Sequence, residues 1–142
     1  MTRILAVDPG SKRVGLALSD PTATIAQGID TVPAEPEASL AGRLAAIARS
    51  HEVARIIVGL PLRLDGTNGP EAAAARRLAA AIRRESGLPV DLVDERLTTR
   101  AADRALIEGG VKREQRRQGI DRVAATMLLQ SHLDHRRRQK PG

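Results

Sequence analysis

The stretch ILAVDPGSKRVGLALS, residues 4–19, decides the fold that the sequence predicts. Two apolar runs flank Pro9, Gly10 and a short basic segment, which is the pattern of two antiparallel strands joined by a turn. We therefore expect a β-hairpin at the start of the chain. The run over residues 25–32 is expected to add a third strand to it.

Strands and helices alternate along the rest of the chain. Apolar residues recur at helical spacing over residues 40–50, and the all-apolar run at 56–58 is typical of a strand buried on both faces. Further elements are expected as a helix over about 70–86, a strand over 90–93, and helices over about 98–108 and 120–135. A hairpin followed by this alternation predicts an α/β fold, in which helices pack on the faces of a mixed sheet.

The composition predicts one domain with an aliphatic core. A chain of 142 residues is close to the usual size of a single domain, which we place at residues 1–135. Residues 136–142 are basic and are expected to form a disordered tail. The sequence has no Phe, Trp, Tyr or Cys, so Leu, Ile, Val and Ala must build the core, and disulfides and thiolate metal sites are excluded.

The charge of the chain favours nucleic acid as a partner. A net charge of +6 and an isoelectric point near 11.1 suit an acidic polymer, although Arg-rich soluble proteins in general share this balance. Without aromatic residues on which bases can stack, recognition must rely on backbone charge and on the shape of the nucleic acid. The sequence shows neither a secretory signal nor an apolar run near the roughly 20 residues of a membrane helix, so we expect a cytoplasmic protein with no membrane partner.

Carboxylates from distant parts of the chain lie where an element begins or ends. Asp8 ends the first strand, and its alternative role is a turn residue that bonds its own backbone. Asp94 and Glu95 are adjacent at the end of a strand, where neighbouring side chains point to opposite faces, and alternation alone does not say which of them shares a site with Asp8. Asp121 lies on the apolar stripe of the last helix, where either metal ligation or capping of free amides would compensate its charge.

Such a group of acids indicates metal-assisted phosphodiester chemistry. Mg²⁺ and Mn²⁺ bind carboxylate oxygens, and two such ions roughly 3.5 to 4 Å apart can hold both the attacking and the leaving oxygen of a phosphodiester. Like charges placed that close repel each other without the metal, so cleavage is expected to depend on the metal.

Basic residues around these acids are candidates for phosphate contacts. Lys12 and Arg13 follow Asp8 in the hairpin turn. The loop over residues 59–71 leaves the carboxyl end of a buried strand and carries Arg63 and Asn68, which we also expect to bind nucleic acid. It enters a helix that Asn68 or the following glycine can cap. The remaining nucleic-acid contacts are expected from Arg96, Lys112, Arg113, Arg116 and Arg117. A solvated run of charge and a simply well-capped loop are the alternatives that remain open.

Four motifs occur in order along the chain. They are VDPGSKRVGLA at 7–17, IVGLPLRLDGTNG at 57–69, DERLTT at 94–99 and IDRVAATMLLQ at 120–130. In this order and at these distances, the series resembles the YqgF/RuvX family of pre-16S rRNA nucleases and Holliday junction resolvases. The resemblance covers nearly the whole chain.

The resemblance implies a ribonuclease H-like fold, with a five-stranded mixed sheet of order 3-2-1-4-5 and helices on both faces. It also implies a divalent metal, Mg²⁺ or Mn²⁺, at a carboxylate cluster. It maps the family's catalytic and metal-binding acids onto Asp8, Glu95 and Asp121, which makes Glu95 rather than Asp94 the inward acid. The segment between Gly110 and Asp121 is Arg-rich where the family often has Lys, so its phosphate contacts do not follow from the resemblance.

The leading hypothesis is a hydrolase that trims the 5′ end of pre-16S rRNA, with structured nucleic acid and the ribosome as its partners. The nearest alternative is resolution of four-way DNA junctions, which requires two sites and hence a dimer; the sequence leaves monomer and homodimer open. A non-catalytic protein that binds nucleic acid or the ribosome is another alternative. A sugar kinase or actin-like ATPase shares the carboxylate and glycine turn after the first strand, but it needs two such domains, and this chain has room for one.

Overall fold

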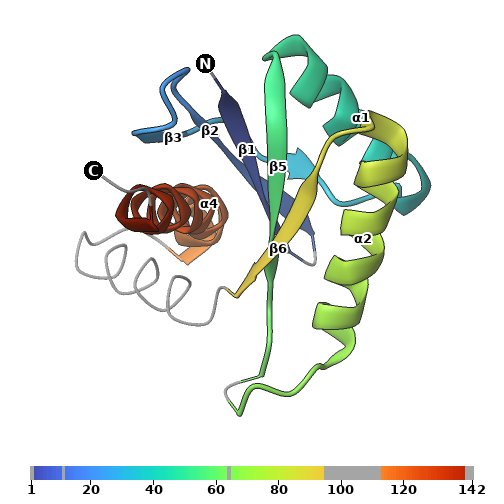
Figure 1. The fold of residues 1–142 in the computed structure, drawn as a ribbon. Coiled ribbons are helices and arrows are strands. Elements are labelled where there is room, and N and C mark those ends of the chain that lie inside the picture. The colour runs from blue at the N-terminus through green and yellow to red at the C-terminus, as the bar shows by residue number, and fades with distance from the viewer. Residues whose placement is uncertain (1, 11, 64, 95–112, 140–142) are drawn as a thin grey trace.

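The computed structural model describes residues 2–10, 12–63, 65–94 and 113–139, and it describes the side chains of the last helix over residues 123–136 (Figure 1). The strands are β1 (Arg3–Pro9), β2 (Arg13–Ser19), β3 (Ala26–Gly28), β4 (Val32–Pro33), β5 (Val53–Leu60) and β6 (Val90–Asp94). The helices are α1 (Glu37–Ser50), α2 (Pro70–Ser86) and α4 (Arg113–Gln139). The helix expected over residues 98–108 lies outside the described residues.

The described strands form one mixed sheet of order β3-β2-β1-β5-β6. β1 pairs antiparallel with β2 and parallel with β5, and β5 pairs parallel with β6. This is the expected 3-2-1-4-5 order of a ribonuclease H-like sheet. The prediction of five strands differs from the structure in one respect, because the third expected strand consists of two pieces, β3 and β4, which both pair with β2.

A register shift separates these two pieces. Ala17 of β2 pairs with Gly28, whereas Val14 of β2 pairs with Val32. Between these two pairs, β2 advances by three residues, from 17 to 14, whereas the segment that pairs with it advances by four, from 28 to 32. One extra residue in the partner is the mark of a β-bulge, which interrupts the ladder and ends β3.

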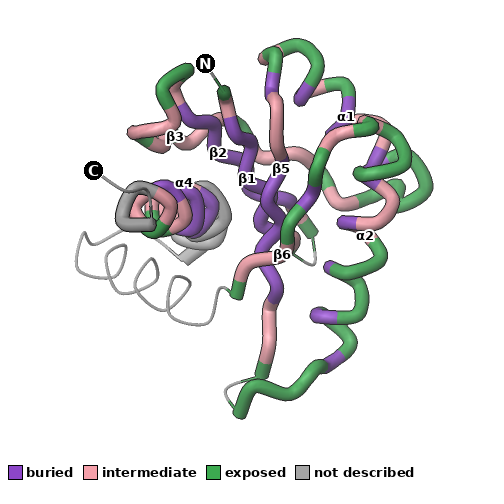
Figure 2. The backbone as a smooth tube through the Cα atoms, in the orientation of Figure 1, coloured by how far each residue is buried: buried purple, intermediate pink, exposed green. Residues whose placement is uncertain are grey.

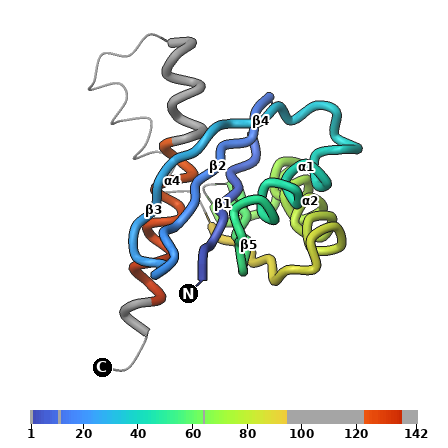
Figure 3. The backbone as a smooth tube through the Cα atoms, turned by 90° about the horizontal axis from the view of Figure 1, so that it is seen from above, coloured from blue at the N-terminus to red at the C-terminus, as the bar shows by residue number. Residues whose placement is uncertain are grey.

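The helices cover both faces of the sheet, with α1 and α2 on one side and α4 on the other (Figure 3). Alternate residues of each strand therefore enter different cores. Leu5 and Val7 of β1 pack in the core beneath α1 and α2, while Ile4 and Ala6 pack against α4. The central strands are buried on both faces, and the exposed residues lie on the outer sides of the helices and in the loops (Figure 2).

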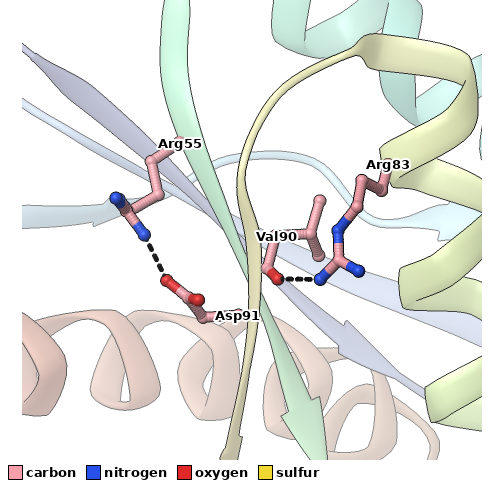
Figure 4. Close-up of polar contacts among 4 residues, drawn as sticks. All are labelled: Arg55, Arg83, Val90 and Asp91. Atoms are coloured by element: carbon pink, nitrogen blue, oxygen red, sulfur yellow. Dashed lines mark hydrogen bonds and ion pairs between the residues drawn. The ribbon is translucent and has the colours of Figure 1, made fainter.

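Two arginines tie β6 to its neighbours (Figure 4). The guanidinium of Arg83 on α2 donates a hydrogen bond of 2.6 Å to the carbonyl oxygen of Val90. Arg55 on β5 forms an ion pair with Asp91 on the same strand as Val90. Because both side chains of this pair are partly exposed, the pair itself adds at most about 1 kcal/mol to stability. Packing of the aliphatic side chains holds the sheet together.

The last helix is longer than the sequence predicts. It begins at Arg113 rather than near residue 120, and it continues to Gln139. Residues 136–139, which were expected to belong to a disordered tail, are therefore helical, and residues 140–142 lie outside the described residues. Across the described part of the chain, no helix combines the length and the apolar character that crossing a membrane requires.

Candidate active site at the carboxyl ends of the strands

Asp8 lies at the carboxyl end of β1, in the middle of the sheet. It pairs with Gly15 of β2, and the turn after it is closed by a 2.9 Å hydrogen bond from the amide of Gly10 to the carbonyl oxygen of Arg13. Only 7% of Asp8 is exposed, so this carboxylate occupies a place that is otherwise filled by apolar side chains. Burying a charged group is costly unless it is compensated.

The pleat of β1 places Asp8 on the face of the sheet that α4 covers. Ile4 and Ala6 pack in the core beneath α4, and Asp8 is the next residue of the same parity. On β2, the corresponding residues are Arg13, Gly15 and Ala17, of which Ala17 packs in that core. Gly15 thus stands beside Asp8 without a side chain.

The register of β5 and β6 shows which acid of the DERLTT motif can share this face. Val7 pairs with Val58, and Leu60 pairs with Asp94, so the carboxyl ends of all three parallel strands meet at one edge. On β6, Leu92 packs in the core beneath α1 and α2, whereas Val93 packs against α4. Asp94, two residues after Leu92, therefore lies on the same face of the sheet as Leu92, which is the face opposite Asp8.

Helix α4 carries position 121 past the same edge. Its C-terminal half lies beside β3 and near the N-terminus of the chain (Figure 3). Gln130 accepts a 2.9 Å hydrogen bond from the amide of Ala26, which pairs with Ser19, and the Ser19 hydroxyl oxygen accepts a 2.8 Å bond from the amide of Ile4. Gln130 and Ile4 are thereby fixed at about the same level of the sheet.

The rise per residue of a helix and of a strand shows how far Asp121 lies from Gln130 and how far Asp8 lies from Ile4. Asp121 precedes Gln130 by nine residues, which is about 14 Å along a helix that rises about 1.5 Å per residue. Asp8 follows Ile4 by four residues, which is about 13 Å along a strand that rises about 3.3 Å per residue. Position 121 is also one turn before Ala125, which packs against the sheet. Position 121 of α4 therefore lies on the same side of the sheet as Asp8, toward the edge at which β1 ends.

The predicted basic residues divide into two groups. Lys12 is exposed in the hairpin turn, and Arg13 is half-buried at the start of β2, beside Asp8. Three arginines, Arg113, Arg116 and Arg117, belong to the first turns of α4 rather than to the irregular segment that the sequence suggested. Glu95, Arg96 and Lys112 lie outside the described residues, as do the side chains of Asp121 and of the three arginines. Among the described residues, no group of three possible metal ligands is assembled.

The loop between β5 and α2 borders the same edge from the other face. Its Leu62 packs against the core beneath α1 and α2. Gly69 rather than Asn68 is the N-cap of α2, and it makes no side-chain cap. The side-chain Oδ1 of Asn68 instead accepts a 3.2 Å hydrogen bond from the guanidinium of Arg76. No sequence pattern singles out Arg76, because its link to Asn68 spans eight residues and forms only in the folded loop.

Comparison with known proteins identifies the family of this chain. A family model described as RuvX, Holliday junction resolvase, matches residues 2–135. The chain belongs to the RuvX family. A relative from Listeria monocytogenes, named "Putative pre-16S rRNA nuclease", is 44% identical over 134 residues, which cover 93% of this chain and 97% of the relative. A relative of the same name from Moorella thermoacetica is 46% identical over 132 residues, or 93% of this chain and 94% of the relative.

The solved structure of Thermus thermophilus RuvC in complex with a Holliday junction substrate shares the fold of this RuvX family member. The two superpose with a TM-score of 0.60 over 96% of each chain, at 15% sequence identity. At this identity the likeness concerns the fold alone. It confirms the ribonuclease H-like architecture expected from the sequence.

Proposed function

We propose that the protein is a metal-dependent nuclease that hydrolyses phosphodiester bonds, with the 5′ region of precursor 16S rRNA as its substrate. The observation that carries this proposal is the buried Asp8 carboxylate, which faces α4 where position 121 reaches the same edge. The names of the curated relatives support the choice of substrate. The proposal implies a cytoplasmic protein that acts on structured RNA at the assembling ribosome.

Asp8, Glu95 and Asp121 would hold Mg²⁺ or Mn²⁺ in this site. Asp8 offers hard oxygen ligands beside Gly15, which has no side chain, and this fits the chemistry of these ions. The alternation that brings Val93 to this face falls next on residue 95, and we therefore propose Glu95 rather than Asp94 as the second ligand. When bound, a pair of such ions supplies an activated water and stabilises the charge on the leaving oxygen.

The protein's own residues would hold and orient the scissile strand. Lys12 and Arg13 lie beside Asp8, and the first turns of α4 carry Arg113 and two further arginines in front of position 121. Cations in these places can bind the phosphates on either side of the cleaved bond, which fixes the strand without reading its sequence. Arg96 and Lys112 are proposed for the same task.

A second candidate function is the resolution of four-way DNA junctions. The description of the matching family model and the fold shared with RuvC favour it. It requires two copies of the active site, so a dimer in solution would support it. A non-catalytic binding protein would keep the fold and bind nucleic acid without cleaving it.

One experiment separates these functions. Wild type and Asp8→Asn are incubated with a precursor rRNA fragment and with a four-way DNA junction, in Mg²⁺, in Mn²⁺ and with a chelator. The proposed function predicts cleavage of the RNA by wild type alone, and only with metal. Cleavage of the junction alone would favour the resolvase, binding without cleavage would favour the non-catalytic protein, and equal activity of the two variants would indicate a contaminant.

A further inference from the structure

Arg63 is held over the start of α2. Its backbone closes the loop, because its amide donates a 3.0 Å hydrogen bond to the carbonyl oxygen of Thr67 and its own carbonyl oxygen accepts a 2.8 Å bond from the amide of Gly66. Its guanidinium lies across the buried Gly69, where an added Cβ would be 3.0 Å from the Arg63 Nε and 3.2 Å from a carboxylate oxygen of Glu71. The exposed Arg63 side chain therefore has a defined place.

Arg76 is directed to the same place from two turns further along α2. Its guanidinium donates a 3.2 Å hydrogen bond to the side-chain oxygen of Asn68, the residue before the helix N-cap. The nearby carboxylate of Asp65 is turned into the loop, since it accepts a 2.9 Å bond from the Thr67 amide and a 2.6 Å bond from the Thr67 hydroxyl. Both arginines are exposed near the first turn of α2, with the Glu71 carboxylate on the same side of Gly69 as the Arg63 guanidinium.

This pair of arginines lies on the other side of the sheet from Asp8. Asp8 faces α4, whereas Leu62 in the loop and Ala72 in the first turn of α2 pack in the core beneath α1 and α2. Both places border the edge formed by the carboxyl ends of β1, β5 and β6. A nucleic acid that reaches Asp8 on one face and these arginines on the other must extend across that edge.

We propose that Arg63 and Arg76 bind the phosphates of a duplex that flanks the cleaved strand, so that the substrate is a junction between duplex and single strand. This inference rests on the proposed nuclease function for the position of the cleaved bond. A guanidinium held by a second residue suits the phosphate of a regular helix, because its planar fork is oriented in advance. A single strand is the less suitable occupant, since sequence-tolerant single-strand binding relies on aromatic stacking and the chain has no aromatic residue.

The test is a binding titration in chelator, where cleavage does not interfere. The probes are an RNA stem that carries a single-stranded 5′ extension, a four-way DNA junction, and the extension alone. The variants are Arg63→Ala and Arg76→Ala, with Arg84→Ala as the matched control, because Arg84 is exposed in the last turn of the same helix. Each affinity is measured over a series of salt concentrations.

For the probes that contain a duplex, Arg63→Ala and Arg76→Ala should each reduce the slope of log K against log salt by about 1, the effect of one lost phosphate contact. For the extension alone, the slope should stay unchanged, and Arg84→Ala should behave as wild type throughout. An equal effect on the extension alone would show that Arg63 and Arg76 bind a single strand rather than a duplex. If neither variant affects any probe, this surface does not bind nucleic acid.

Two further variants keep the two proposals distinguishable. Asn68→Ala retains both cations but releases Arg76, so it should weaken binding of the stem probe while the extension alone binds as before; unchanged binding of the stem probe would contradict the positioning role of Asn68. In an Asp8→Asn background, Arg63→Ala should still reduce the slope for the stem probe by about 1. If the arginine variants behave as expected and wild type cleaves nothing in Mg²⁺ or Mn²⁺, the nuclease proposal fails and the duplex-binding surface stands.

Discussion

Gln130 on α4 accepts a hydrogen bond from the backbone amide of Ala26 on β3, over a distance of 2.9 Å and a separation of 104 residues. The side-chain amide of the same glutamine donates a 3.0 Å bond to the carbonyl oxygen of Thr24. This two-sided contact joins the helix to the edge of the sheet. It holds α4 against β3, together with the packing of Ala125, Leu128 and Leu129 in the core on that face.

Replacing Gln130 by alanine should loosen this contact. The amide of Ala26 and the carbonyl of Thr24 lose their partner, which should lower the free energy of unfolding by about 1–3 kcal/mol in a denaturant titration. Cleavage should fall as well, because α4 is no longer held at one level. Ser131→Ala, at the exposed neighbouring position, is the control. Full activity of folded Gln130→Ala would show that the level of α4 is set elsewhere.

Substitutions of Asp8, Glu95 and Asp94 should differ in their effect on the cleavage rate. Asp8→Asn and Glu95→Gln should each reduce the cleavage rate by about 100-fold or more, since the loss of a metal ligand removes several kcal/mol of transition-state stabilisation. Asp94→Asn should retain most of the rate, because Asp94 has the parity of Leu92 on the opposite face. A reversed order of Asp94 and Glu95 in a single-turnover assay would overturn the alternation argument.

His132 should make the stability of the protein depend on pH. Burial lowers the pKa of its imidazole below the ordinary 6.5, and its Nε2 has no hydrogen-bond partner in the described part of the chain. The neighbouring charges are Arg136, Arg55 and His135, which lower the pKa further, and Asp91, which raises it. The folded protein therefore resists protonation at this site.

The sign of the effect follows from proton binding. Near and below pH 6.5 the unfolded chain binds more protons at His132 than the folded protein does, so the free energy of unfolding should decrease as the pH falls through this value. Chemical denaturation of wild type and His132→Leu between about pH 8 and 5 tests this expectation, with His51→Gln as the control. A decrease of the same size in His132→Leu would assign the pH dependence to other groups.

Gly69→Ala should affect binding more than folding. Gly69 has an extended backbone with φ −111°, which any residue adopts, so the added methyl group meets only the side chains of Arg63 and Glu71. We expect a change of less than about 1 kcal/mol in the free energy of unfolding, together with weaker binding of the stem probe because Arg63 is displaced. Gly42→Ala, where the added Cβ has open space, is the control. Unchanged binding in Gly69→Ala would show that Arg63 needs no fixed position.

The central strands could be predicted from the sequence because their signals are strong, whereas the order of the sheet followed from the family resemblance. The hairpin at 4–19 and the apolar run at 56–58 became β1, β2 and the middle of β5, and the helix expected over 70–86 is α2. The division of the third strand was missed. A bulge adds one residue to a strand, and such an addition leaves no mark in a short run of mixed polarity.

Boundaries and side-chain roles were harder to predict. The last helix was expected to begin near residue 120, but α4 begins at Arg113. The Arg, Glu and Gln residues before Gly119 are good helix formers. Asn68 was expected to cap α2 or to bind phosphate, and in the structure it bonds Arg76. Local sequence showed the capping tendency of Asn68 but not the partner that competes for its oxygen.

The aliphatic core has an experimental consequence. A protein without tyrosine or tryptophan is nearly silent in ultraviolet absorption near 280 nm and has no intrinsic emission of its own. Titrations with RNA or DNA can therefore follow the optical signal of the nucleic acid without a contribution from the protein. A single tryptophan introduced at the half-buried Leu62 would be the sole fluorophore, and it would report directly on what happens at the loop beside Arg63.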